Sequence, residues 1–202
     1  MLGNRLEQQI LEVFDRDISS LFSINQISKK LNKSYPHINA KVNNLIKEGV
    51  LSKANVGRSY LCSLNLENEK SIALLILESA RKKEKAVSKI KNNSIFFDEI
   101  YRIKKEFRVH TLLLANDSLF FVIDYLHDKE AIKNMFSEIK QFNLLFFDTG
   151  GFIDHLLQNP GLIRELIVLY SYEKYFEIVN SVKSKLISKT LFSKDKKKKD
   201  GK

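Results

Sequence analysis

Polar side chains that could contact a polyanion are concentrated between residues 34 and 58. In a stretch with helical spacing they are Ser34, Tyr35, His37, Asn39, Lys41, Asn43, Asn44 and Lys47, with the small Ala40 among them. After that stretch they are Lys53, Asn55 and Arg58. Amide and ammonium groups can hydrogen-bond base edges in the major groove, cations can bind phosphates, and a small alanine permits close approach. No acidic residue occurs from Lys33 to Lys47. The pattern therefore predicts contact with double-stranded DNA.

Other patterns that could support chemistry are incomplete. Thr149-Gly150-Gly151 falls between a predicted strand and a predicted helix, where N–H groups can bind an anion, but it lacks the Lys-Ser/Thr of a phosphate-binding loop. His110, His127 and His155 share no metal-ligand spacing with Cys or carboxylates. Ser171 lacks the flanking glycines of a nucleophile elbow. We expect no catalytic residue, no metal ion and no cofactor, and hence no enzyme.

Hydrophobic spacing predicts the elements that position the polar side chains in a first domain, residues 1–66. Helices are expected over 5–14 and from a Ser23 cap onward, with a short extended piece over 18–22 between them. A third helix would begin at Ser34, carry Pro36 in its first turn and end at Gly49. Two alternating segments, 50–54 and 58–65, then predict a hairpin.

A 100° step per residue places the polar side chains of the third helix opposite its apolar ones. The side chains expected to point inward are Ile38, Val42, Leu45 and Ile46, and those expected to point outward are Pro36, His37, Ala40, Asn43, Asn44 and Lys47. Lys53, Asn55 and Arg58 of the hairpin would lie against a neighbouring stretch of DNA backbone.

Residues 23–65 closely resemble the winged helix-turn-helix of prokaryotic, including archaeal, transcriptional regulators of the MarR-like and ArsR-like kind. The resemblance includes the segment from Leu45 to Leu51, which reads L-x-x-x-G-h-L at the exit into the wing. It implies that the recognition helix, residues 34–48, enters the major groove and that the wing, residues 50–65, contacts the backbone. It also implies a homodimer that reads paired half-sites.

The formal net charge of +10 is unevenly distributed. The excess lies in residues 1–66, in a connector over 67–92 and in the lysine-rich end of the chain, whereas 93–193 is close to neutral. The connector is expected to be a helix whose apolar stripe, Ile72, Leu75, Ile76, Ser79 and Ala80, could form the dimer contact or pack on the first domain. The tail 191–202 is expected to be disordered.

Residues 93–190 predict a second domain of the α/β class with a four-stranded sheet. The expected order is helix, strand, turn, strand, helix over 129–141, strand, helix, strand, helix. In element order this resembles nucleotidyltransferase-like domains found behind winged helices in some archaeal proteins. Active members of that superfamily carry a Gly-Ser turn and two carboxylates one residue apart. Here the turn at 115–118 has no glycine and the next strand holds Asp124 alone.

The sequence thus predicts an α+β winged helix-turn-helix followed by a small α/β domain without a catalytic motif. We interpret the chain as a sequence-specific DNA-binding transcriptional regulator whose second domain serves dimerisation, sensing or partner binding. One alternative is a metal-dependent nucleotidyltransferase that uses Asp117, Asp124 and Asp148, and another is a protein-interaction scaffold.

The chain has a single cysteine, Cys62, at an apolar strand position, and no apolar run of 20 residues. These two features predict a cytoplasmic protein that does not enter the membrane.

Overall fold

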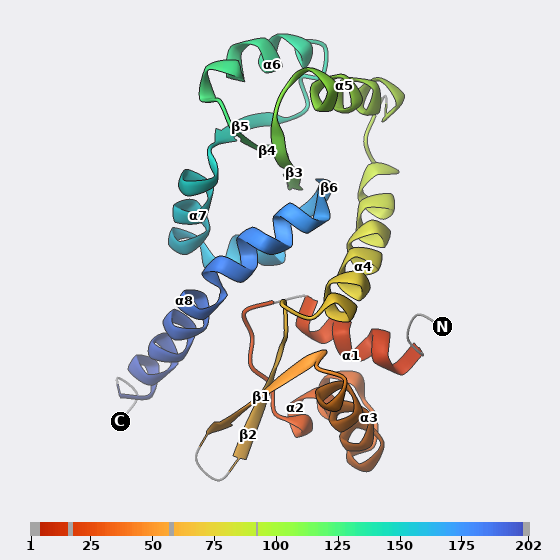
Figure 1. Ribbon diagram of the computed structural model, residues 1–202, viewed down its shortest axis with the longest axis vertical. Helices are drawn as coiled ribbons and strands as arrows, with labels where there is room; N and C mark the ends of the chain where they lie inside the picture. Colours follow the sequence, from red (N-terminus) through yellow and green to blue (C-terminus); the bar gives the residue numbers. More distant parts are fainter. Residues whose placement is uncertain (1–4, 16–17, 57–58, 92, 200–202) are drawn as a thin grey trace. The chain divides into compact units, whose positions relative to one another are not determined.

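The computed structural model describes residues 5–15, 18–56, 59–91 and 93–199, with side chains except at 56, 59 and 188–199. The chain forms two compact units, Met1–Ile76 with Val179–Lys202, and Leu77–Ile178 (Figure 1). Each unit combines helices with one small sheet, which makes the protein α+β. Two long helices, α4 (Glu69–Val87) and α8 (Tyr172–Lys199), contribute residues to both units.

The first unit contains the three predicted helices and the predicted hairpin. The helices are α1 (Arg5–Asp15), α2 (Ile24–Leu31) and α3 (Tyr35–Lys47), and the hairpin pairs β1 (Leu51–Val56) with β2 (Ser59–Leu64). Ser23 and Gln26 form a capping box that begins α2, because each side chain bonds the other residue's N–H, at 3.2 and 2.8 Å. The extended piece expected over 18–22 is reduced to a bridge between Phe22 and Cys62.

Apolar side chains from all these elements meet in one core. The fully buried ones include Ile10 and Phe14 of α1, Ile27 of α2, Ile38, Val42 and Leu45 of α3, Leu64 of β2 and Leu75 of α4. Each contributes about 1.5–3 kcal/mol by leaving water. Three inward positions predicted for α3 are confirmed, and the fourth, Ile46, is half-buried. Because this face of α3 is anchored in the core, the opposite face is held toward solvent.

The second unit contains a mixed four-stranded sheet in the order β5-β4-β3-β6. Its strands are β3 (Val109–Ala115), β4 (Ser118–Ile123), β5 (Asn143–Phe147) and β6 (Ile167–Tyr170). Strand β3 runs antiparallel to β4 and β6, and β4 runs parallel to β5. The four strands were predicted, whereas the likeness to nucleotidyltransferase-like domains stays a prediction.

Helical segments cover both faces of this sheet. Phe120 and Phe121 are neighbours in β4 and so point to opposite faces, and each contacts a different segment. The helical elements are α5 (Asn93–Glu106), η1 (Leu126–Asp128), α6 (Lys129–Met135), α7 (Thr149–Gln158) and η2 (Pro160–Arg164). Phe121 contacts Phe136, which directly follows α6, with ring centroids 5.6 Å apart. Phe120 contacts Phe152 of α7 at 6.5 Å.

Two predicted boundaries were wrong. The helix expected over 129–141 ends at Met135, although Phe136 and Ile139 are buried as the spacing requires. They reach the core from turns instead, with Ile139 N–H donating to the carbonyl of Phe136. The tail expected to be disordered is helical as far as Lys199, because α8 continues through it. Among the described residues, no helix is both long and apolar enough to cross a membrane.

Candidate nucleic-acid interface

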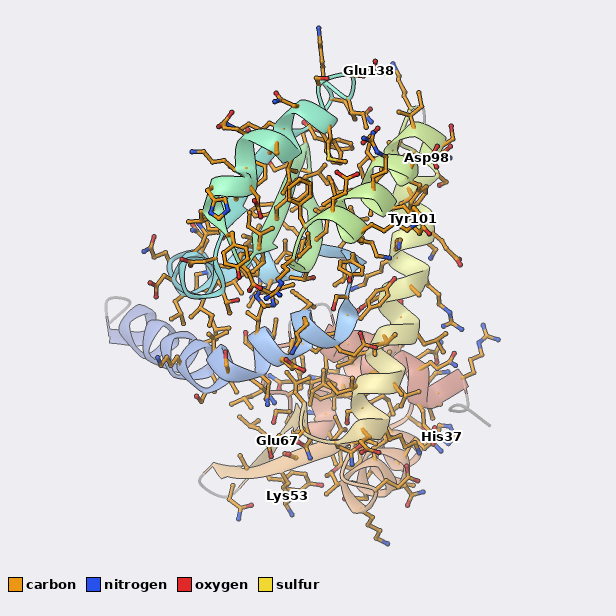
Figure 2. The ribbon with its side chains drawn as sticks, turned by 45° about the horizontal axis from the view of Figure 1, so that its top comes forward. His37, Lys53, Glu67, Asp98, Tyr101 and Glu138 are labelled. Carbon is orange, nitrogen blue, oxygen red and sulfur yellow. The ribbon has the colours of Figure 1, made fainter. Side chains whose placement is uncertain are left out.

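The solvent-facing side of α3 carries no acidic side chain. Pro36, Ala40, Asn44 and Lys47 are exposed along its centre, and Asn43 is half-buried beside them. We call these five residues the outer face of α3. His37 on one flank and Lys53 on the hairpin also lie at the surface of this unit (Figure 2). The outer face is narrow, polar and built around a small alanine, which suits close approach to a groove.

One flank of α3 joins the hairpin through a chain of polar contacts. Asn43 Nδ2 donates to Asn39 Oδ1 at 3.1 Å, and the Tyr60 hydroxyl donates to Asn43 Oδ1 at 3.5 Å. The Lys53 ammonium lies 3.9 Å from the centre of the Tyr60 ring. Partial burial raises the pKa of Tyr60, reinforced by Cys62 and Tyr35, so the hydroxyl keeps its proton and can donate. The outer face of α3 is thereby continuous with the hairpin.

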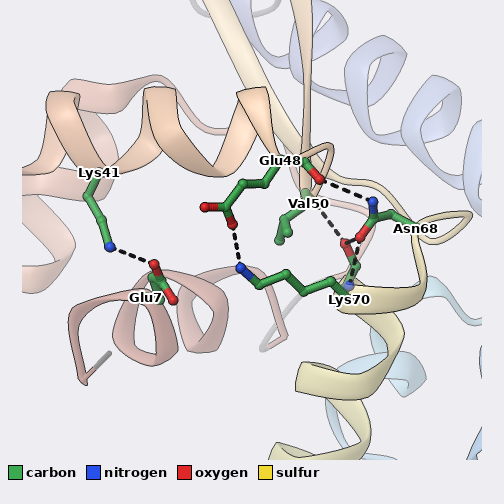
Figure 3. Close-up of polar contacts among 7 residues, drawn as sticks. Glu7, Lys41, Glu48, Val50, Asn68 and Lys70 are labelled. Atoms are coloured by element: carbon green, nitrogen blue, oxygen red, sulfur yellow. Dashed lines mark hydrogen bonds and ion pairs between the residues drawn. The ribbon is translucent and has the colours of Figure 1, made fainter. Parts of the chain in front are cut away.

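The opposite flank of α3 is fixed by two ion pairs (Figure 3). Lys41 Nζ lies 2.5 Å from Glu7 Oε1 of α1. Glu48, which follows α3, pairs with Lys70 of α4. The hydrogen bond that Lys70 donates to the Glu48 carboxylate raises the pKa of Lys70. Both carboxylates near α3 are therefore compensated by a cation, which limits their repulsion of a phosphate.

Three side chains that follow the hairpin in sequence donate hydrogen bonds to the three carbonyls directly after α3. Asn68 Nδ2 donates to the carbonyl of Glu48 at 3.2 Å, and Asn65 Nδ2 donates to that of Gly49 at 2.9 Å. Ser71 Oγ donates to the carbonyl of Val50 at 3.0 Å (Figure 3). Gly49 adopts the left-handed conformation with φ of 72°, which glycine accepts without strain. These bonds set the direction in which the chain leaves α3 for the wing.

The predicted site residues occupy different settings. Tyr35, His37, Ala40, Asn44, Lys47, Lys53 and Asn55 are exposed, and Asn39 and Asn43 belong to the polar chain toward Tyr60. Ser34 takes the cap position of α3, but its side chain makes no cap hydrogen bond. Lys41 points to Glu7 rather than outward, and Arg58 lies outside the described residues.

The sequence did not identify Tyr60 as part of this surface, although its ring contacts Lys53 and its hydroxyl contacts Asn43. It pairs with Asn55 in the hairpin, and Lys53 pairs with Cys62. Paired residues of an antiparallel hairpin share a face, so Lys53, Asn55 and Tyr60 lie on one side. The alternation of the strand residues could have placed Tyr60 on this side from the sequence alone. The buried residues Leu51 and Leu64 lie on the same side of the hairpin, farther from its tip.

The three carboxylates of the nucleotidyltransferase alternative do not all lie at one place. Asp117 precedes β4 and Asp124 follows it, so they lie at opposite ends of a strand roughly 20 Å long. Asp124 Oδ1 contacts His110 Nε2 at 2.5 Å, and Asp148 Oδ1 accepts from Gly151 N–H at 2.6 Å as the cap of α7. No three His, Cys, Asp or Glu residues among those described could together hold a metal ion.

Cys62 is fully buried, as predicted. Burial raises the pKa of its thiol to about 11, and Lys53 opposes the rise only in part. The thiol therefore stays protonated at neutral pH and lacks the thiolate character that a redox sensor needs.

Comparisons with known proteins leave the family of the chain open. No protein-family model matches it, and no curated protein matches it. A crystal structure of MepR, a transcription regulator of the Staphylococcus aureus multidrug efflux pump MepA, is similar over 50% of this chain and 76% of that chain. The identity is 14% and the TM-score 0.36. The function is therefore inferred from the geometry of the first unit.

Proposed function

We propose that the chain is a sequence-specific, double-stranded DNA-binding transcriptional regulator. The outer face of α3 enters the major groove, where Asn43, Asn44 and Lys47 face base edges, and the hairpin contacts the adjoining backbone through Lys53. The observation that carries the proposal is the acid-free outer face of α3, joined to the hairpin through the bond between Tyr60 and Asn43.

The electrostatic setting of α3 supports a polyanionic partner. Glu7 and Glu48 are matched by Lys41 and Lys70, so the unit presents Lys47 and Lys53 without a carboxylate beside them on the outer face. Arg58 remains part of the proposal from the sequence alone. Lys41 is left out of the contacts, because moving its ammonium to a phosphate would leave Glu7 without that cation.

Association of two copies through α4 also remains a prediction. Leu75 and Ser79 of its apolar stripe are buried within the single chain, so a partner copy would have to use other positions of α4. Sedimentation of the full chain measures this directly. A monomer that still binds duplex would leave the role of α3 intact.

The proposal is tested by titrating a fluorescent random-sequence duplex at several salt concentrations. The intact chain should bind at low salt, and Lys53→Ala, which removes the proposed backbone contact, should reduce the slope of log K against log salt by about 0.9. Lys47→Ala should weaken binding. Lys129→Ala, in the second unit, is the control and should leave the slope unchanged. Absence of binding at low salt would refute the proposal and favour a protein-interaction scaffold. Mapping bound genomic sites then tests sequence specificity.

A further inference from the structure

A hollow of about 590 Å³ opens beside the first turn of α3, on the flank away from the hairpin. Arg5, Leu6 and Gln9 line it from α1, Lys33 lines it from the turn before α3, and His37 lines it from α3 itself. The side chain of Leu6 is buried, whereas the two cations and the imidazole are exposed. The hollow is therefore an open surface site in which two cations, an amide and an imidazole border apolar surface.

The charge of this hollow is not compensated from within. Neither Arg5 nor Lys33 forms an ion pair with another residue that the structure describes. Glu7 is the nearest acid in sequence to Arg5, but its carboxylate is paired with Lys41. Two cations on a concave surface without a carboxylate partner favour an anion.

The start of α3 adds backbone donors at the same place. The first N–H groups of a helix have no partner within it, and Ser34 does not cap them with its side chain. The N–H of His37 is one of these groups, and its side chain lines the hollow. A phosphate oxygen is a suitable acceptor here, because helix N-termini favour negative charge.

We infer that this hollow binds a phosphodiester of the duplex backbone, through Arg5, Lys33 and the first turn of α3. The inference rests on the proposed function. Two phosphate backbones border a major groove, and a helix lying in that groove has one on each side. The hairpin with Lys53 lies on one flank of α3, and the hollow lies on the other. The hollow thus serves the second backbone, which the hairpin does not reach.

The test is a duplex titration with the double variant Arg5→Ala/Lys33→Ala. The slope of log K against log salt should fall by about 0.9 for one lost phosphate contact, and by nearly twice that for two. Arg5→Lys/Lys33→Arg should retain the slope, because charge is conserved. Arg108→Ala/Lys129→Ala removes the same two charges from the second unit and should not change the slope.

The outcomes separate this inference from the proposed function. If Lys47→Ala weakens binding while Arg5→Ala/Lys33→Ala retains the wild-type slope, the hollow is not a backbone site and the inference fails alone. If no duplex binds, the proposed function fails, and inorganic phosphate tests the hollow by NMR. Saturable shifts of His37 and Gln9 that vanish in the double variant would then assign the hollow to a free phosphate group. Absence of such shifts would leave it without a ligand.

Discussion

The Lys53 ammonium lies 3.9 Å from the centre of the Tyr60 ring, across the two strands of the hairpin. The hydroxyl of the same ring reaches Asn43 of α3. A single aromatic side chain therefore orients a cation of the wing and contacts an amide of the helix. This ring therefore adds a contact between wing and helix to the bonds that Asn65, Asn68 and Ser71 make where the chain leaves α3.

Replacement of Tyr60 tests this coupling. Tyr60→Leu removes both the ring and the hydroxyl, and duplex affinity should fall by about twofold to fivefold, the range expected from a cation–π contact at an exposed site. Tyr60→Phe keeps the ring and should lose less. The measurement is fluorescence anisotropy with a random duplex at low salt. Equal affinities for wild type and Tyr60→Leu would contradict the coupling.

Ala40 lies at the centre of the outer face of α3 and is exposed. Ala40→Glu places a carboxylate where a duplex is proposed to lie, so affinity should fall by about tenfold at low salt, or about 1.4 kcal/mol. Ala40→Gln has nearly the same size without the charge and is the matched control. Both favour helix, and the thermal unfolding midpoint should change little. Equal duplex affinities of the two variants would show that charge at this position does not affect binding.

Gly49 sets the exit of α3 toward the wing. Its φ of 72° disfavours any side chain, and a Cβ would lie 3.0 Å from Asn68 Nδ2, the group that bonds the Glu48 carbonyl. Gly49→Ala should therefore lower the free energy of unfolding by about 1–2 kcal/mol in urea titrations. Gly161→Ala is the control, because nothing lies within 4 Å of its Cβ position. A Gly49→Ala protein as stable as Gly161→Ala would contradict the backbone argument.

Asp148 caps α7 by accepting a hydrogen bond from Gly151 N–H. Asp148→Ala removes the bond to Gly151 N–H and should destabilise the second unit by about 1 kcal/mol. Asp148→Asn retains an acceptor and should restore most of that loss.

Incubation with labelled nucleoside triphosphates and magnesium should give no incorporation for wild type. Incorporation that is lost in Asp124→Asn would instead support the enzyme alternative.

Cys62 should be inert in the folded protein. Its pKa is raised to about 11 from an ordinary value of 9.0, so the folded state favours the protonated thiol. The resulting stability is complete below about pH 9 and is lost between about pH 9 and 11, as the unfolded thiol ionises first. Cys62→Ala should flatten the pH dependence of unfolding in this window. Rapid reaction of native protein with an aromatic disulfide at pH 8 would show that the thiol is accessible.

The sequence was sufficient for most elements of the first unit, because their signals are local. The Ser23 capping box, Pro36 in the first turn and Gly49 at the exit determine where helices begin and end through bonds spanning a few residues. Apolar spacing likewise identified the buried side of α3. The same spacing was misleading at Phe136 and Ile139, since turns can bury residues three apart as well as a helix can.

Contacts between segments distant in sequence were decided only by the tertiary structure. The outward polar pattern of α3 could not reveal that Lys41 meets Glu7, because this depends on how α1 packs against α3. Nor could it reveal that Tyr60 reaches Asn43 or that Arg5 shares a hollow with Lys33. Residue types and helical periodicity specify which side chains face outward. Packing of the elements specifies which of them are engaged by a charge of the opposite sign, as Lys41 is by Glu7.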